Sequence, residues 1–145
     1  LLEITESALM TDPKAAEELL LSLRALGIRF AVDDFGTGYS SLSYLRRFPL
    51  SALKVDRSFV ADMVDSPHAR TIVSAVLSLA RELGLVAIAE GVETDAQNKL
   101  LAAQGCNLVQ GWRFARAVAA ADFESAVTDG RFVVGEGEVF APRVS

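Results

Sequence analysis

The sequence has little of several residue types, with one cysteine, one histidine and one tryptophan among its 145 residues. The single cysteine, Cys106, excludes an internal disulfide and a zinc site made of cysteines alone, and it is expected to be a small buried residue. No apolar run approaches the roughly 20 residues of a bilayer-spanning helix. We expect a cytoplasmic location, no signal peptide and no membrane segment in this chain.

Positive charge is also scarce, because 14 lysines and arginines face 19 acidic residues and leave a net charge of −5. Non-specific binding to a nucleic acid requires clustered basic side chains that displace counterions from phosphates. We therefore expect no DNA or RNA partner. Hydrophobic residues make up 51% of the chain, which is enough to bury the core of one domain.

Strand and helix patterns alternate along the whole chain. Apolar strands are expected at residues 1–5, 28–34, 52–56, 85–89 and 107–111. Caps, among them Asp12, Ser66 and Thr94, and apolar stripes predict helices at about 13–26, 41–47, 67–83, 94–104 and 119–128. The tail from Arg131 is a weak strand or a loose end. Alternation of this kind is typical of an α/β fold with a parallel sheet.

Polar residues occupy the C-terminal ends of these strands, which is the rim where a TIM barrel builds its active site. They are Glu3, Asp33, Asp34, Lys54, Asp56, Glu90 and Gln110. The expected strands number about three fewer than the eight of a whole barrel. The sequence therefore predicts a partial TIM-like (β/α) barrel.

Asp33 and Asp34 stand side by side in the stretch AVDDFGTGYSSL, residues 31–42. Like charges this close raise each other's pKa or require a cation between them. Oxygen ligands without a second histidine suit Mg²⁺ or Mn²⁺ better than zinc, and His68 is expected to lie at a helix start. Two such ions can activate a water and stabilise a phosphate oxygen, so phosphoester hydrolysis is the predicted chemistry.

Lys54 and Asp56 are two residues apart on one expected strand, so both side chains point to the same face. A site inside a barrel and a plain salt bridge from Lys54 to Asp33 or Asp56 both account for them. A third hypothesis is an aldolase that forms a Schiff base on Lys54. That chemistry requires a lowered lysine pKa, which neighbouring carboxylates oppose.

Other residues have two interpretations. Glu90 and Glu93 flank Gly91, and Glu93 either stabilises the start of the following helix or belongs to a catalytic loop. Glu6 is expected to anchor a neighbouring loop. Trp112 and Phe114 either pack against the core or stack on a base.

Five motifs in this order resemble the EAL-domain family: EITES at 3–7, DDFGTGYSSL at 33–42, KVDRSFV at 54–60, AEGVET at 89–94 and QG at 110–111. The resemblance runs from Leu1 to about Val127. It implies a TIM-like barrel that hydrolyses the second messenger cyclic diguanylate to linear pGpG with Mg²⁺ or Mn²⁺, two ions in a complete domain. Residues 1–130 would form the C-terminal portion of that barrel, and 131–145 a tail.

The same resemblance implies a role for each matching residue. Metal ligation falls to Glu3, Asp33 and Asp34, with Asp56 supporting the metal site. Lys54 would hold the attacking water and Glu90 would be the general base. Substrate binding or loop anchoring falls to Glu6, Glu93, Gln110, Gly36, Thr37 and Gly38.

Three parts of the family pattern are not found in this sequence: the Glu-Ala-Leu signature, an asparagine metal ligand and a substrate-binding arginine. In the family they lie on strands that come before the segment seen here. We expect this chain to hydrolyse little or nothing alone and to belong to a longer parent with sensory or GGDEF-type domains. The alternative is a non-catalytic module for cyclic-dinucleotide binding or assembly, and exposed apolar edges predict association between chains.

Overall fold

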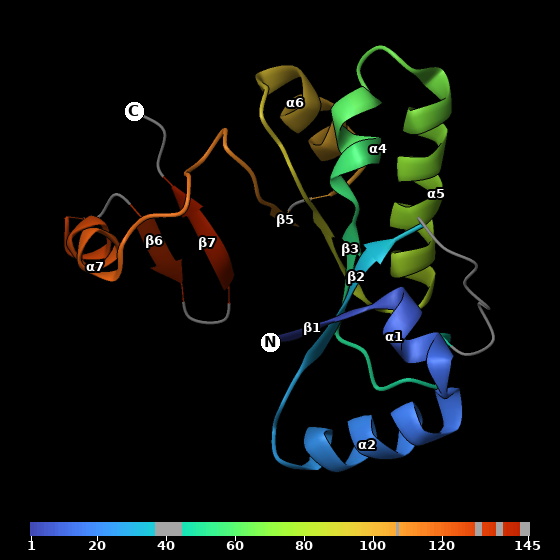
Figure 1. Cartoon of the computed structure of the whole chain (residues 1–145). Helices are drawn as coiled ribbons and strands as arrows, with labels where there is room; N and C mark the ends of the chain where they lie inside the picture. The colour runs from blue at the N-terminus through green and yellow to red at the C-terminus, as the bar shows by residue number, and fades with distance from the viewer. Residues whose placement is uncertain (37–44, 107, 130–131, 136–137, 143–145) are drawn as a thin grey trace.

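The computed structural model describes residues 1–36, 45–106, 108–129, 132–135 and 138–142. Five strands form one sheet in the order β1-β2-β3-β4-β5, and each neighbouring pair is parallel (Figure 1). Their bounds are Leu2–Thr5, Phe30–Phe35, Ala52–Val55, Val86–Ala89 and Leu108–Val109. The predicted parallel α/β architecture is confirmed, and β5 is shorter than expected.

Three long helices begin where the caps predict. They are α2 (Pro13–Ala25), α5 (Pro67–Glu82) and α6 (Asp95–Ala103). The side chains of Asp12, Ser66 and Thr94 each accept a hydrogen bond from a backbone N–H in the first turn that follows. Thr94 and Gln97 form the full capping box. These local contacts fix the positions at which the chain turns back along the sheet.

Two six-residue helices were not predicted: α1 (Glu6–Thr11) and α4 (Arg57–Asp62). Each directly follows a strand and is too short to show a helical hydrophobic period. The predicted helix α7 spans Ala120–Thr128, and the tail forms an antiparallel hairpin of β6 (Phe132–Gly135) and β7 (Glu138–Pro142). Most of the helix expected at 41–47 lies outside the described residues.

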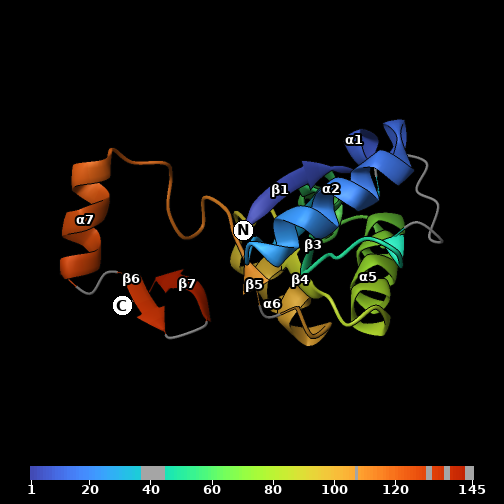
Figure 2. The same cartoon turned by 90° about the horizontal axis from the view of Figure 1, so that it is seen from below.

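The hydrophobic core lies between one face of the sheet and the helices α1, α2, α4, α5 and α6, whereas α7 lies apart beside β6 and β7 (Figures 1 and 2). Leu53 and Val55 of β3 point into it, and Val73, Val76 and Ala80 of α5 pack from the other side. The opposite face of the sheet carries the small apolar cluster of Ala31, Ala52, Ile88 and Leu108. Since side chains alternate along a strand, Lys54 must point to this second face.

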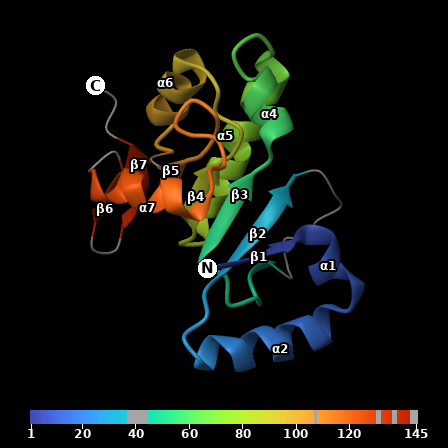
Figure 3. The ribbon, with the colours of Figure 1, turned by 60° about the vertical axis from the view of Figure 1, so that its left-hand side comes forward.

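The sequence pattern predicts that one side of α2 is buried through Ala16, Leu19, Leu20, Leu23 and Leu26, and this prediction is wrong at two positions. Leu20 is buried, but Leu19 is 58% exposed and Leu26 is 76% exposed. The helix lies beside the end of the sheet formed by β1 and β2, so only one side of it meets the core (Figure 3). Leu26 is the C-cap residue, one position beyond the last helical residue.

Candidate active site

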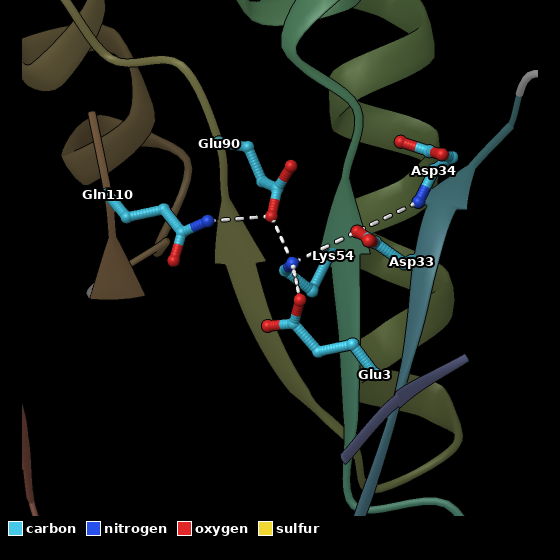
Figure 4. Close-up of polar contacts among 6 residues, drawn as sticks. All are labelled: Glu3, Asp33, Asp34, Lys54, Glu90 and Gln110. Atoms are coloured by element: carbon cyan, nitrogen blue, oxygen red, sulfur yellow. Dashed lines mark hydrogen bonds and ion pairs between the residues drawn. The ribbon is translucent and has the colours of Figure 1, made fainter. Parts of the chain in front are cut away.

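Lys54 lies at the centre of the candidate site, with a side chain that is only 3% exposed. Its Nζ atom is 2.7 Å from Glu3 Oε2 and 3.0 Å from Asp33 Oδ1, and it also contacts Glu90 Oε1. Figure 4 shows these side chains converging on Lys54 from β1, β2 and the end of β4. A buried ammonium group is costly unless it is paired, and here three carboxylates pair it.

The surroundings of Lys54 hold it in the charged form. Burial lowers the pKa of Lys54, but the contacts with Glu3, Glu90 and Asp33 outweigh burial and raise the pKa above its ordinary value of 10.5. A Schiff-base lysine needs the opposite shift, so the aldolase hypothesis does not fit. Of the two predicted salt-bridge partners, Asp33 pairs with Lys54, and among the described ion pairs Asp56 does not.

The adjacent residues Asp33 and Asp34 reach the same rim because the strand is irregular there. Neighbouring strand residues normally point to opposite faces. The pairing of β2 with β3 shifts register between Val32 and Phe35, and Asp34 has a left-handed backbone with φ of 53°. The Asp34 N–H donates to Asp33 Oδ1 at 3.1 Å. The alternation rule alone does not predict this arrangement.

Three acidic residues could hold a metal ion together. One carboxylate oxygen from each of Asp33, Asp34 and Glu90 lies within 4.8 Å of the other two. Burial raises the pKa of Glu90 despite the nearby Lys54, and the pKa of Asp34 is raised by desolvation and then by Asp33 and Asp56. Several carboxylates share the single positive charge of Lys54 here, and carboxylate oxygens are hard ligands that suit a divalent ion such as Mg²⁺ or Mn²⁺.

Asp56 caps a helix. Its Oδ1 atom accepts the Ser58 N–H at 2.9 Å and also the Ser58 hydroxyl, which fixes the first turn of α4. Burial raises the pKa of Asp56, but the Ser58 hydrogen bonds outweigh it and the net pKa is lowered. Among the described residues, neither Asp56 nor Glu3 belongs to the three-carboxylate group. Ser58 was not anticipated from the sequence, although its spacing after Asp56 fits a cap.

We predict that Asp56→Ala lowers the free energy of unfolding by about 1 kcal/mol at pH 7. Asp56→Asn should keep most of the stability that the cap contributes, since asparagine also caps helices. Because the folded-state pKa is lowered, the contribution of the Asp56 charge is present above its ordinary pKa of 3.8 and disappears as pH falls through the lowered value. Urea unfolding at several pH values measures this. An Asn variant as unstable as the Ala variant contradicts the cap.

Glu6 contacts the loop that follows β2. The side chain is buried, and Oε2 accepts the Gly36 N–H at 3.3 Å. Gly36 has φ of +98°, and a Cβ there would lie 3.2 Å from Phe59 Cε2. Glu6 thus holds the chain where it leaves the strand. The predicted loop residues Thr37 and Gly38 lie outside the part of the chain that the structure describes.

Gln110 and Glu93 have different surroundings. Gln110 Nε2 donates to Glu90 Oε1 at 2.7 Å, so Gln110 joins the cluster (Figure 4). Glu93 is exposed, and its backbone N–H donates to Gln97 Oε1 at 2.8 Å. No contact among the described residues joins the Glu93 side chain to Lys54. The geometry at Glu93 is that of a helix start.

Gly111 fixes the position of Gln110, a role that the sequence did not reveal. A Cβ at Gly111 would lie 2.2 Å from Val92 O and 2.3 Å from Val92 N, both backbone atoms. The Val92 N–H also donates to Gln110 O at 3.0 Å. The end of β5 is therefore packed directly onto the loop that follows Glu90.

We expect Gly111→Ala to destabilise the fold by about 1–3 kcal/mol, because two backbone segments must separate. Gly105→Ala is the matched control, since Gly105 also has a positive φ of +82° but nothing within 4 Å of its added Cβ. Urea unfolding of both variants separates the clash from the backbone cost. Equal losses in the two variants would show that the close approach to Val92 does not matter.

No described helix combines the length and the apolar character that crossing a membrane requires.

A family model described as "EAL domain" matches residues 1–117. Among curated proteins, the chain is 48% identical over 131 residues to the cyclic di-GMP phosphodiesterase NbdA of Pseudomonas aeruginosa. That match covers 90% of this chain and 17% of NbdA, so the chain spans about a sixth of that relative.

Solved structures agree with the family match. The phosphodiesterase MucR of Pseudomonas aeruginosa, in complex with c-di-GMP, superposes with a TM-score of 0.81 at 45% identity. The match covers 83% of this chain and 49% of that one. A manganese and c-di-GMP complex of Klebsiella pneumoniae BlrP1 gives a TM-score of 0.73 at 39% identity, over 79% of this chain and 29% of that one.

Proposed function

Because this chain belongs to the EAL domain family, we propose that it forms part of a metal-dependent phosphodiesterase that hydrolyses cyclic diguanylate to linear pGpG. The observation that carries the proposal is the cluster of Glu3, Asp33 and Glu90 around Lys54, with Asp34 beside it. Relatives named as cyclic di-GMP phosphodiesterases support the substrate. Manganese and calcium complexes of BlrP1 support a divalent ion.

Glu90 is the proposed general base. Its Oε1 atom is held by both Lys54 and Gln110, while its other oxygen takes no part in these contacts. Burial raises the pKa of Glu90, and a carboxylate with a raised pKa is a better proton acceptor near neutral pH. Glu90 would take a proton from the attacking water as the water oxygen bonds to phosphorus and the bond between phosphorus and one ribose oxygen breaks. That ribose oxygen would leave as a hydroxyl group, with a proton supplied by solvent.

Lys54 is the proposed partner of that water. Its raised pKa keeps it an ammonium group at neutral pH, so it can donate a hydrogen bond but cannot accept a proton. Glu3, Asp33 and Asp34 are the proposed ligands of Mg²⁺ or Mn²⁺, and Asp56 is the proposed supporting residue. Bound there, the ion supplies Lewis-acid stabilisation of the charge that develops on phosphate oxygens.

The chain alone is predicted to give little or no pGpG, because the resemblance assigns further metal and phosphate contacts to residues outside it. The assay incubates the chain with cyclic diguanylate and Mn²⁺ and measures pGpG by chromatography. Multiple turnovers by the chain alone contradict this prediction. A non-catalytic binding module is favoured instead if cyclic diguanylate binds without hydrolysis, both to this chain alone and to a full domain in which a relative supplies the preceding strands.

A completed domain, in contrast to the chain alone, is expected to be active. We define it as this chain joined to the part of the MucR phosphodiesterase that precedes the matched segment. The 45% identity between the two proteins makes the chain a close replacement for the segment it substitutes. We expect this completed domain to hydrolyse cyclic diguanylate and to lose activity when the divalent ion is chelated.

A further inference from the structure

Trp112 is exposed although it is a large aromatic residue, and it follows Gln110 of the candidate site by two positions in the chain. The sequence leaves packing and base stacking open for Trp112 and Phe114. Phe114 packs against the core, whereas Trp112 is 61% exposed. Packing therefore accounts for Phe114 and not for Trp112.

The backbone on both sides of Trp112 is bonded to the loop after Glu90. Gln110 O accepts the Val92 N–H at 3.0 Å, and the Arg113 N–H donates to Val92 O at 3.0 Å. Trp112 is only two residues from Gln110, so their Cα atoms are at most about 7 Å apart. Gln110 in turn contacts the proposed base Glu90. The backbone of Trp112 is thus fixed next to Gln110, which contacts the catalytic cluster.

Neighbouring arginines hold this segment in place. The Arg116 guanidinium lies 4.4 Å from the centre of the Trp112 ring, in cation–π contact. Arg113 Nε is 2.6 Å from Asp95 Oδ1, and the Arg113 guanidinium lies 4.9 Å from the centre of the Phe114 ring. A flat aromatic surface kept in position and exposed to solvent suits stacking on a base.

We propose that Trp112 is the stacking platform for one guanine base of the cyclic dinucleotide and that Arg116 is a positioning residue for its ring. This inference rests on the proposed function, since the substrate is the source of the base. Every base has a π face, so stacking contributes affinity and does not distinguish guanine from adenine. Discrimination between bases falls to other groups in the completed domain.

The test uses the fluorescence of Trp112, which is the single tryptophan of the chain. Cyclic diguanylate is titrated into the chain with Mg²⁺, where little hydrolysis is expected, and indole emission should fall as the base stacks. By calorimetry, Trp112→Ala should bind about 5- to 100-fold more weakly, and Trp112→Phe should keep most of the affinity. The matched control, Phe123→Ala, removes an exposed aromatic side chain of α7 and should not alter binding.

Arg116 is tested by a conservative pair of variants. Arg116→Lys should keep part of the affinity through its remaining cation, and Arg116→Ala should lose more.

Unchanged emission up to millimolar cyclic diguanylate overturns the inference, as does wild-type affinity in Trp112→Ala. A completed domain that forms pGpG with the same KM in Trp112→Ala overturns the inference but keeps the proposed function. If cyclic diguanylate quenches the indole emission but the completed domain never hydrolyses it, the stacking inference is supported and the proposed hydrolase function is contradicted.

Discussion

Glu90→Gln in the completed domain should lower the turnover number about 10²- to 10⁴-fold, because glutamine cannot accept the proton of the attacking water. The amide keeps the shape of the carboxylate and an oxygen that Lys54 can contact. Binding of cyclic diguanylate should therefore persist. Turnover is measured by pGpG formation and binding by calorimetry under non-hydrolysing conditions.

The matched control for this experiment is Glu82→Gln at the end of α5, an exposed residue on a different element. It removes the same charge from the protein and should leave turnover near the wild-type value. Wild-type turnover in Glu90→Gln would remove Glu90 from the mechanism. Equal losses in both variants would point to a general effect of net charge.

Lys54→Met should destabilise the chain by about 2–3 kcal/mol at pH 7 in the absence of divalent ions. Removing one partner of a buried ion pair typically costs about 3–5 kcal/mol, and partial solvent access reduces that cost here. The Glu3 side chain is 48% exposed, Asp33 is 23% exposed and Glu90 is 16% exposed. Methionine fills a similar volume, so the loss reports the missing charge.

The pH dependence of the Lys54→Met loss follows from the pKa shifts. The folded-state pKa of Lys54 is raised, so its stabilising contribution is full below 10.5 and is lost as pH rises through the higher folded value. The pKa of Glu90 is raised, so Glu90 becomes protonated at acidic pH and no longer repels its acidic neighbours in the variant, and the difference from wild type should narrow. In urea unfolding, the loss should be equal at pH 7 and pH 9, both below 10.5, and smaller at pH 4.

Lys54→Arg is the control, because it keeps the positive charge with a different shape. Mn²⁺ should restore part of the stability of Lys54→Met, since an ion among the same carboxylates replaces the missing positive charge. A loss in Lys54→Met that is equal at pH 4 and pH 7 and unaffected by Mn²⁺ would contradict an electrostatic role.

The sequence predicted the architecture where local signals are strong. Caps at Asp12, Ser66 and Thr94 and the apolar stripe of α5 located the helices, and alternation with apolar strands predicted the parallel sheet. The failures are physical in origin. Six-residue helices such as α1 and α4 show no period, and burial along α2 depends on which side meets the sheet.

For the site, strand-end position predicted which residues approach one another. Glu3, Asp33, Lys54 and Glu90 do converge, because a parallel register brings the C-terminal ends together. The sequence did not predict the contacts that depend on the exact path of the backbone. The bulge that turns Asp34 toward Asp33, the bond from Ser58 to Asp56 and the contact of Gly111 with Val92 all depend on backbone geometry between segments.

The central claim is that the cluster around Lys54 is this chain's share of a metal-dependent cyclic-diguanylate phosphodiesterase. Its most direct test is the amount of pGpG formed by the completed domain with Mn²⁺, before and after chelation of the ion. We predict multiple turnovers that stop on chelation. A folded completed domain that binds Mn²⁺ and cyclic diguanylate but forms no pGpG would contradict the account.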